Sequence, residues 1–93
     1  LYVIRLLPER LKVDRSAIFH ELRQRNIGVN VHYPPLHLHP FYQENFGTRP
    51  GDCPVAEAEA AHILSLPMFP RMSDEDVEDV ICAVQETLAA HRV

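Results

Sequence analysis

The sequence predicts an α+β fold in which a small, mostly antiparallel sheet is covered by helices. Three observations support it: β-branched and aromatic residues gather at 1–6 and 28–33, apolar residues recur at helical spacing over 74–92, and a proline-rich stretch separates these segments. A chain of 93 residues has room for one modest core. We therefore expect a single domain over residues 1–93, with the order β-α-β-loop-α-β-α.

The first half is predicted to form a strand, a helix and a second strand. The strand at 1–6 ends before Pro8, and a helix over 14–26 follows, in which the Asp14 carboxylate can cap the first turn. Valines alternate with polar residues over 28–33, which predicts a strand with one buried face. In the helix we expect an inward stripe of Ile18, Phe19 and Leu22 and a solvated face of Arg15, Glu21, Arg23 and Arg25.

A long connection over 34–51 follows, in which only 41–46 has the character of a helical turn. Connections of this length inside a domain are usually functional or disordered. The apolar content of this one predicts that it is ordered and packs on something; the residues concerned are Leu36, Leu38, Phe41, Tyr42 and Phe46.

The last part is predicted to form helix, strand and helix. An alanine-rich helix begins at Pro54 and runs to about Leu64, and 65–67 is a short third strand. Ser73 caps the final helix, whose first turn is acidic and therefore suits the positive end of the helix dipole. The expected buried face of this helix consists of Val77, Val80, Ile81, Val84 and Leu88.

Composition excludes several classes of function. The net charge of −4 and pI near 5.8 argue against a nucleic-acid or anionic-membrane surface, and no apolar run could span a bilayer. We expect a cytoplasmic protein in which Cys53 and Cys82 are reduced and partly buried. The chain starts with what looks like a strand and lacks an initiator methionine, so we expect a fragment of a longer protein.

The proline-rich stretch over 32–42 is the candidate site, because it holds three histidines, two tyrosines and three prolines. Proline stiffens a loop, and rigid loops commonly display binding groups. The histidine spacing matches no established zinc motif, although a metal site and simple surface hydrogen bonding both stay open. Imidazoles and phenols can also orient sugar hydroxyls, Arg49 could meet a phosphate, and Tyr33 or Phe41 could cover a sugar or base. No nucleophile motif or phosphate-binding glycine loop is present.

Several blocks of the chain resemble the C-terminal domain of the DegT/DnrJ/EryC1/StrS family of sugar aminotransferases, which depend on pyridoxal 5′-phosphate (PLP). The blocks occur in the family's order and cover nearly the whole chain. They are NIGVNVHY at 26–33, PLHL at 35–38, PFY at 40–42, GDCPVAE at 51–57, LSLPMFP at 64–70 and MSDEDV at 72–77.

The resemblance implies the small domain of a fold-type-I enzyme that works as a homodimer with a separate cofactor domain. Such enzymes hold PLP on a lysine and transfer an amino group, usually from glutamate, to a nucleotide-linked keto sugar. The form His-Tyr-x-Pro-x-His is most similar to members that aminate C4 of a UDP-sugar for cell-surface polysaccharide or related glycans. By this resemblance His32, Tyr33 and His37 border the substrate, and His37 is the best single contact.

Two departures from the family pattern limit what the chain does alone. Its one lysine, Lys12, has no PLP-lysine context, so we expect no bound cofactor, no catalytic residue and no activity in these 93 residues. His39 stands where relatives often have glutamine, and its role stays open. The alternative is a free-standing α+β module that binds or senses a small molecule.

Overall fold

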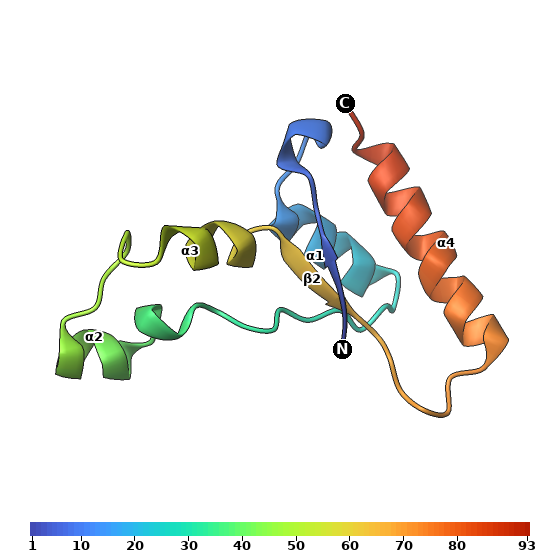
Figure 1. The fold of residues 1–93 in the computed structure, drawn as a ribbon. Coiled ribbons are helices and arrows are strands. Elements are labelled where there is room, and N and C mark those ends of the chain that lie inside the picture. Colours follow the sequence, from blue (N-terminus) through green and yellow to red (C-terminus); the bar gives the residue numbers. More distant parts are fainter.

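A computed structural model describes all residues 1–93 and confirms an α+β fold (Figure 1). Two short 3-10 turns, Pro8–Arg10 and Leu36–Leu38, accompany the regular elements. The strands are β1 (Tyr2–Arg5) and β2 (Ile63–Leu66), and the helices are α1 (Arg15–Gln24), α2 (Pro40–Phe46), α3 (Pro54–Ala60) and α4 (Asp74–Ala90). None of the helices combines the length and apolar character needed to cross a membrane.

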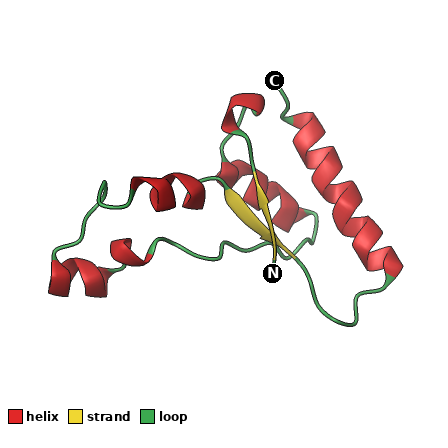
Figure 2. Cartoon of the chain, in the orientation of Figure 1, coloured by secondary structure: helices red, strands yellow, loops and turns green.

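The sheet has two antiparallel strands, in a register that pairs Tyr2 with Leu66 and Arg5 with Ile63 (Figure 2). The predicted strand over 28–33 is wrong, because this segment makes only one bridge, between Asn30 and Ser65. Its extension fails for a local reason. The Asn30 side chain accepts the next backbone N–H at 2.8 Å, and two prolines follow at 34 and 35, which have no N–H to give.

Helix α1 forms where the sequence predicts it. The Asp14 carboxylate accepts the N–H of Ala17 at 3.0 Å, and Ile18 and Leu22 are almost fully buried. Beyond its end, Asn26 takes the left-handed conformation with φ of 63°, which turns the chain back toward the sheet.

Arg15 does not face water as expected. Its guanidinium donates to the carbonyl oxygens of Ala60 and Ile63, at 2.6 and 3.2 Å, and so joins α1 to the start of β2. This junction also marks a second difference from the sequence prediction. Helix α3 ends at Ala60 rather than near 64, because residues 63–66 pair with β1 instead.

The core lies between the sheet, α1 and α4. A salt bridge from Arg25 to Glu86 and a hydrogen bond between His91 Nε2 and Glu21, both at 2.6 Å, also link the two helices. Seven apolar residues form the buried cluster: Leu6, Ile18, Leu22, Ile27, Val29, Leu64 and Ala83.

The buried face of α4 is partly different from the predicted stripe. Val80, Val84 and Leu88 pack against the core, but the most deeply buried positions of the helix are Ala83 and Thr87. Val77 and Ile81 are 41% and 42% exposed and line an open apolar groove beside the sheet. The other apolar walls of this groove, which has a volume of about 450 Å³, are Tyr2, Ile4, Leu66, Pro67, Met68, Met72, Val80 and Val84.

Residues 33–61 form an arm that extends away from the sheet and carries α2 and α3 (Figure 1). The molecule measures 47 × 35 × 19 Å and has a radius of gyration of 15.4 Å, larger than the roughly 12 Å of a compact domain of this length. The apolar residues of this connection were expected to pack on something, and three of them, Leu36, Phe41 and Phe46, are 61%, 60% and 68% exposed. Phe41, Tyr42 and Phe46 instead pack on one another within α2.

Candidate functional site

His32 stands at the base of the arm and is held on the sheet. Its Nδ1 lies 2.8 Å from the hydroxyl oxygen of Ser65, a buried residue of β2. The bridge between Asn30 and Ser65 fixes the backbone two residues earlier. The position of the His32 ring is thus set by this bridge and by the contact with the Ser65 hydroxyl. The next residue, Tyr33, is joined through a cis peptide bond and is 69% exposed, with its ring edge-on to His32 at 4.7 Å.

His37 lies farther along the arm, in the short turn Leu36–Leu38. Its Nε2 is 3.1 Å from Glu57 Oε2, and its side chain is only 10% exposed. The Thr48 hydroxyl donates to the backbone carbonyl of His37 at 2.6 Å. Glu57 of α3 therefore holds the ring of His37, and Thr48 in the loop before α3 holds its main chain.

The Glu57 carboxylate is the centre of this cluster. It accepts backbone N–H groups from Gly51 at 3.0 Å and from Cys53 at 3.2 Å, in addition to the His37 ring. The hydrogen bond from Gly51 is the main reason that the pKa of Glu57 lies below its ordinary value. The bonds from His37 and Cys53 lower this pKa further, while desolvation acts in the opposite direction. Glu57 is therefore a well-held anion at neutral pH.

The three predicted site residues thus fall into two separate groups. His32 and Tyr33 share the base of the arm, and His37 belongs to the cluster around Glu57; no hydrogen bond or ring contact joins the two. Sequence reasoning found these histidines but gave no role to Ser65 or Glu57. The second of these stands in the GDCPVAE block, so its signal was present, but 20 residues separate it from His37.

Other polar residues near the arm are less engaged. The His39 side chain is exposed and makes no hydrogen bond, although its backbone carbonyl accepts the N–H groups of Tyr42 and Gln43 at the start of α2. Arg49 contributes only its main chain: its N–H donates to the Asp52 carboxylate at 3.0 Å, and its carbonyl oxygen accepts the Asp52 N–H at 3.2 Å. Cys53 and Cys82 are free thiols, and both are exposed rather than partly buried as expected.

Neither a metal nor PLP has a set of ligands in this chain. No three histidine, cysteine, aspartate or glutamate side chains gather closely enough to hold a metal ion. Lys12 is exposed, and its backbone N–H donates to the carbonyl oxygen of His91 at 2.8 Å, next to the bridge between Leu11 and Arg92. The residues present therefore do not provide the lysine to which PLP bonds.

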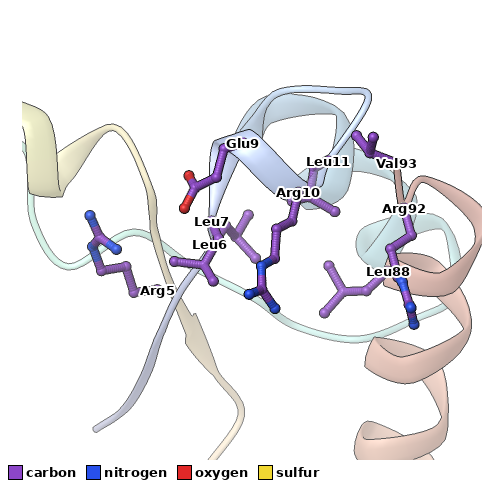
Figure 3. Close-up of a pocket in the computed structure, with 9 residues that line it drawn as sticks. All are labelled: Arg5, Leu6, Leu7, Glu9, Arg10, Leu11, Leu88, Arg92 and Val93. Carbon is purple, nitrogen blue, oxygen red and sulfur yellow. The ribbon is translucent and has the colours of Figure 1, made fainter.

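A hollow of about 620 Å³ lies elsewhere, between the turn after β1 and the end of α4 (Figure 3). Figure 3 shows Leu88 between the side chains of Arg10 and Arg92, and Leu6, Leu7, Leu11 and Val93 complete the apolar part of the lining. None of His32, Tyr33 or His37 lines this hollow. The Arg5 guanidinium at its edge already pairs with Glu59 at 2.9 Å, so we place the candidate site on the arm and not here.

Comparison with known proteins decides the family. The model of the DegT/DnrJ/EryC1/StrS aminotransferase family matches residues 1–85. The chain belongs to this family. The resemblance inferred from the sequence blocks is confirmed.

Two curated family relatives are similar over almost the whole chain. An uncharacterised protein of Methanocaldococcus jannaschii, MJ1066, is 45% identical over 99% of this chain and 24% of its own length. The spore coat polysaccharide biosynthesis protein SpsC of Bacillus subtilis is 44% identical over 92% of this chain and 22% of its own length. The chain therefore spans about a quarter of the length of these relatives.

Solved structures give the same result for the fold. The Streptococcus pneumoniae protein Spr1654, assigned as a sugar aminotransferase and solved in its PMP form, superposes with a TM-score of 0.84 and 31% identity. That match covers 97% of this chain and 22% of the other. The aminotransferase TlmJ of Streptoalloteichus hindustanus gives 0.70 and 38%, over 82% of this chain and 19% of the other. The family fold thus extends over the arm as well as the core.

Proposed function

We propose that the chain is the C-terminal domain of a longer, PLP-dependent sugar aminotransferase. The match to Spr1654 across 97% of the chain carries this proposal, supported by the family membership. The relatives are about four times longer than the chain, which leaves room for a cofactor domain. Because this chain offers no PLP lysine, the proposal assigns the cofactor to that other domain and treats these 93 residues as inactive alone.

In this proposal the arm forms one wall of the substrate site. PLP supplies the electron sink for amino transfer, and the protein orients the substrate. His32 and Tyr33 present an imidazole and a phenol at the base of the arm, and His37 presents a second imidazole held by Glu57. Such groups suit a ligand rich in hydroxyls, because each can donate or accept a hydrogen bond.

The finer assignment follows the sequence motif. We propose a nucleotide-linked keto sugar as substrate, with amination at C4 of a UDP-sugar and glutamate as amino donor, in a cytoplasmic homodimer. The similarity to SpsC, a spore coat polysaccharide biosynthesis protein, supports a role in polysaccharide biosynthesis.

The test uses the full-length parent protein. We expect it to show PLP absorbance and to transfer an amino group to a nucleotide keto sugar. His37→Asn should lower kcat/KM by about tenfold or more, whereas His20→Asn, on the exposed face of α1, should leave it unchanged. A parent protein that binds no PLP would overturn the proposal.

A further inference from the structure

The Glu57 carboxylate accepts hydrogen bonds from the backbone N–H groups of Gly51 and Cys53 and contacts the ring of His37. We infer that Glu57 is a positioning residue that fixes the orientation and tautomer of His37, and so presents His37 Nδ1 as an acceptor to a hydroxyl group of the sugar substrate. This inference rests on the proposed function, because it assumes that His37 contacts the substrate.

The first step is the geometry of the carboxylate. Oε2 lies 3.0 Å from Gly51 N, 3.2 Å from Cys53 N and 3.1 Å from His37 Nε2, and Oε1 lies 3.0 Å from Gly51 N. Two backbone donors that are two residues apart hold the carboxylate in one place. A side chain held in this way can in turn hold the ring that it contacts, as in other sites where a carboxylate orients a histidine.

The second step is the protonation of the ring. An ionised carboxylate can only accept hydrogen bonds, so the hydrogen in this contact belongs to His37 Nε2. In a neutral imidazole the other nitrogen is then unprotonated and acts as an acceptor. The partner of the ring thus selects the Nε2–H tautomer.

The third step is the free nitrogen. Nδ1 of His37 has no hydrogen-bond partner in the chain and is not among the buried polar atoms left unpaired. The Thr48 hydroxyl holds the main chain of the same residue, and Glu57 holds the ring through Nε2. His37 Nδ1 is thus an acceptor in a fixed position, which suits a hydroxyl donor. The hydroxyl-rich ligand of the proposed function is the sugar substrate.

The experiment compares four forms of the full-length parent: wild type, Glu57→Gln, Glu57→Ala and Glu59→Gln. Glu59 is the matched control, since it is on the same helix but pairs with Arg5 and not with a histidine. We expect kcat/KM to fall about tenfold in Glu57→Ala and less in Glu57→Gln, which keeps an acceptor oxygen. Glu59→Gln should match wild type. Thermal unfolding of each form identifies any variant that fails to fold, and Glu57→Gln then carries the test.

A double-mutant cycle separates positioning from a structural effect. If Glu57 acts through His37, then Glu57→Gln should have no further effect on kcat/KM once His37→Ala is present. Losses that simply add would overturn the inference. An ordinary kcat/KM in His37→Ala alone would instead remove the proposed substrate role of His37. A loss in His37→Ala without any loss in the Glu57 variants would overturn the positioning role alone.

A second readout does not depend on activity. Nitrogen-15 spectra of the parent protein with labelled histidine, assigned with the His37→Ala variant, report which ring nitrogen carries the proton. We expect protonated Nε2 and unprotonated Nδ1 when the ring is neutral. The opposite tautomer in wild type would contradict the inference.

Discussion

Nδ1 of His32 and the hydroxyl of Ser65 lie 2.8 Å apart and join the candidate site to the sheet. Ser65 is buried on β2 and also exchanges two backbone hydrogen bonds with Asn30, at 2.8 and 3.1 Å. The chain from 30 to 32 is thereby fixed on β2 by one bridge and one side-chain contact, although it is not a strand. These three bonds set the direction in which the arm leaves the body.

Replacement of Ser65 by alanine should loosen this junction. The variant loses the hydroxyl partner of His32 and should lower the free energy of unfolding by about 1 kcal/mol. Denaturant unfolding of the chain measures this. Ser16→Ala is the control, because Ser16 is exposed on α1 and should change stability by less than about 0.5 kcal/mol. Equal values for the two variants would show that the hydrogen bond contributes nothing.

Features set by neighbouring residues were predictable from the sequence. Asp14 and Ser73 cap their helices as expected, because a cap depends on residues within one turn. The role of Arg15 was not predictable, since its partners lie 45 and 48 residues away. The missing strand at 28–33 has a local cause, because the Asn30 side chain accepts the next backbone N–H and prolines follow at 34 and 35. Alternation shows only what a strand would bury.

The candidate site was also predictable only in part. His32 and His37 were found because a stretch crowded with histidine and proline is visible in the sequence. Glu57 and Ser65, which hold those rings, belong to elements 20 and 33 residues farther along the chain. The apolar residues of the arm were expected to pack on something, but Leu36, Phe41 and Phe46 are exposed in this chain.

The stability contributed by Glu57 should depend on pH. Its pKa is lowered in the folded state from an ordinary value of 4.5, so the ionised form is favoured by folding. This contribution is therefore complete above pH 4.5 and is lost as the pH falls through the lower, folded value. We expect wild type to exceed Glu57→Gln in unfolding free energy at neutral pH, with the difference shrinking in acid.

The control for this pH series is Glu59→Gln, which removes the same charge from the same helix. Urea unfolding at several pH values from neutral to acid supplies the measurement. A wild-type advantage over Glu57→Gln that stays constant throughout the acid range would contradict a lowered pKa of Glu57 in the folded state. Stability changes with pH only where the folded and unfolded states bind different numbers of protons.

The Ser73 cap at the start of α4 can be tested directly by substitution. Ser73 Oγ accepts the N–H of Asp76 at 3.0 Å, and Asp76 accepts the N–H of Ser73 at 3.1 Å. Ser73→Ala should lower the free energy of unfolding by about 1 kcal/mol, whereas Ser73→Asp should preserve it. Loss of stability in both variants would mean that the hydroxyl has a role other than capping.

Two leucines allow burial to be tested with the same chemical change. Leu22 is 0% exposed in the core, and Leu36 on the arm is 61% exposed. Leu22→Ala should lower the free energy of unfolding by about 2–5 kcal/mol, because it leaves a cavity. Leu36→Ala should change it by less than about 0.5 kcal/mol in the 93-residue chain. Similar losses from both would mean that the arm folds back onto the body in solution.

The apolar groove beside α4 predicts how the isolated chain behaves. Val77 and Ile81 are half exposed there and face apolar residues of the sheet, so the groove presents continuous apolar surface to water. We expect the isolated chain to self-associate with rising concentration in sedimentation experiments. Exchange of Val77 and Ile81 for glutamine should weaken that association, whereas Val55→Gln, at a site 76% exposed on the arm, should not. A wild-type chain that stays monomeric throughout would show that the groove is stable in water without a partner.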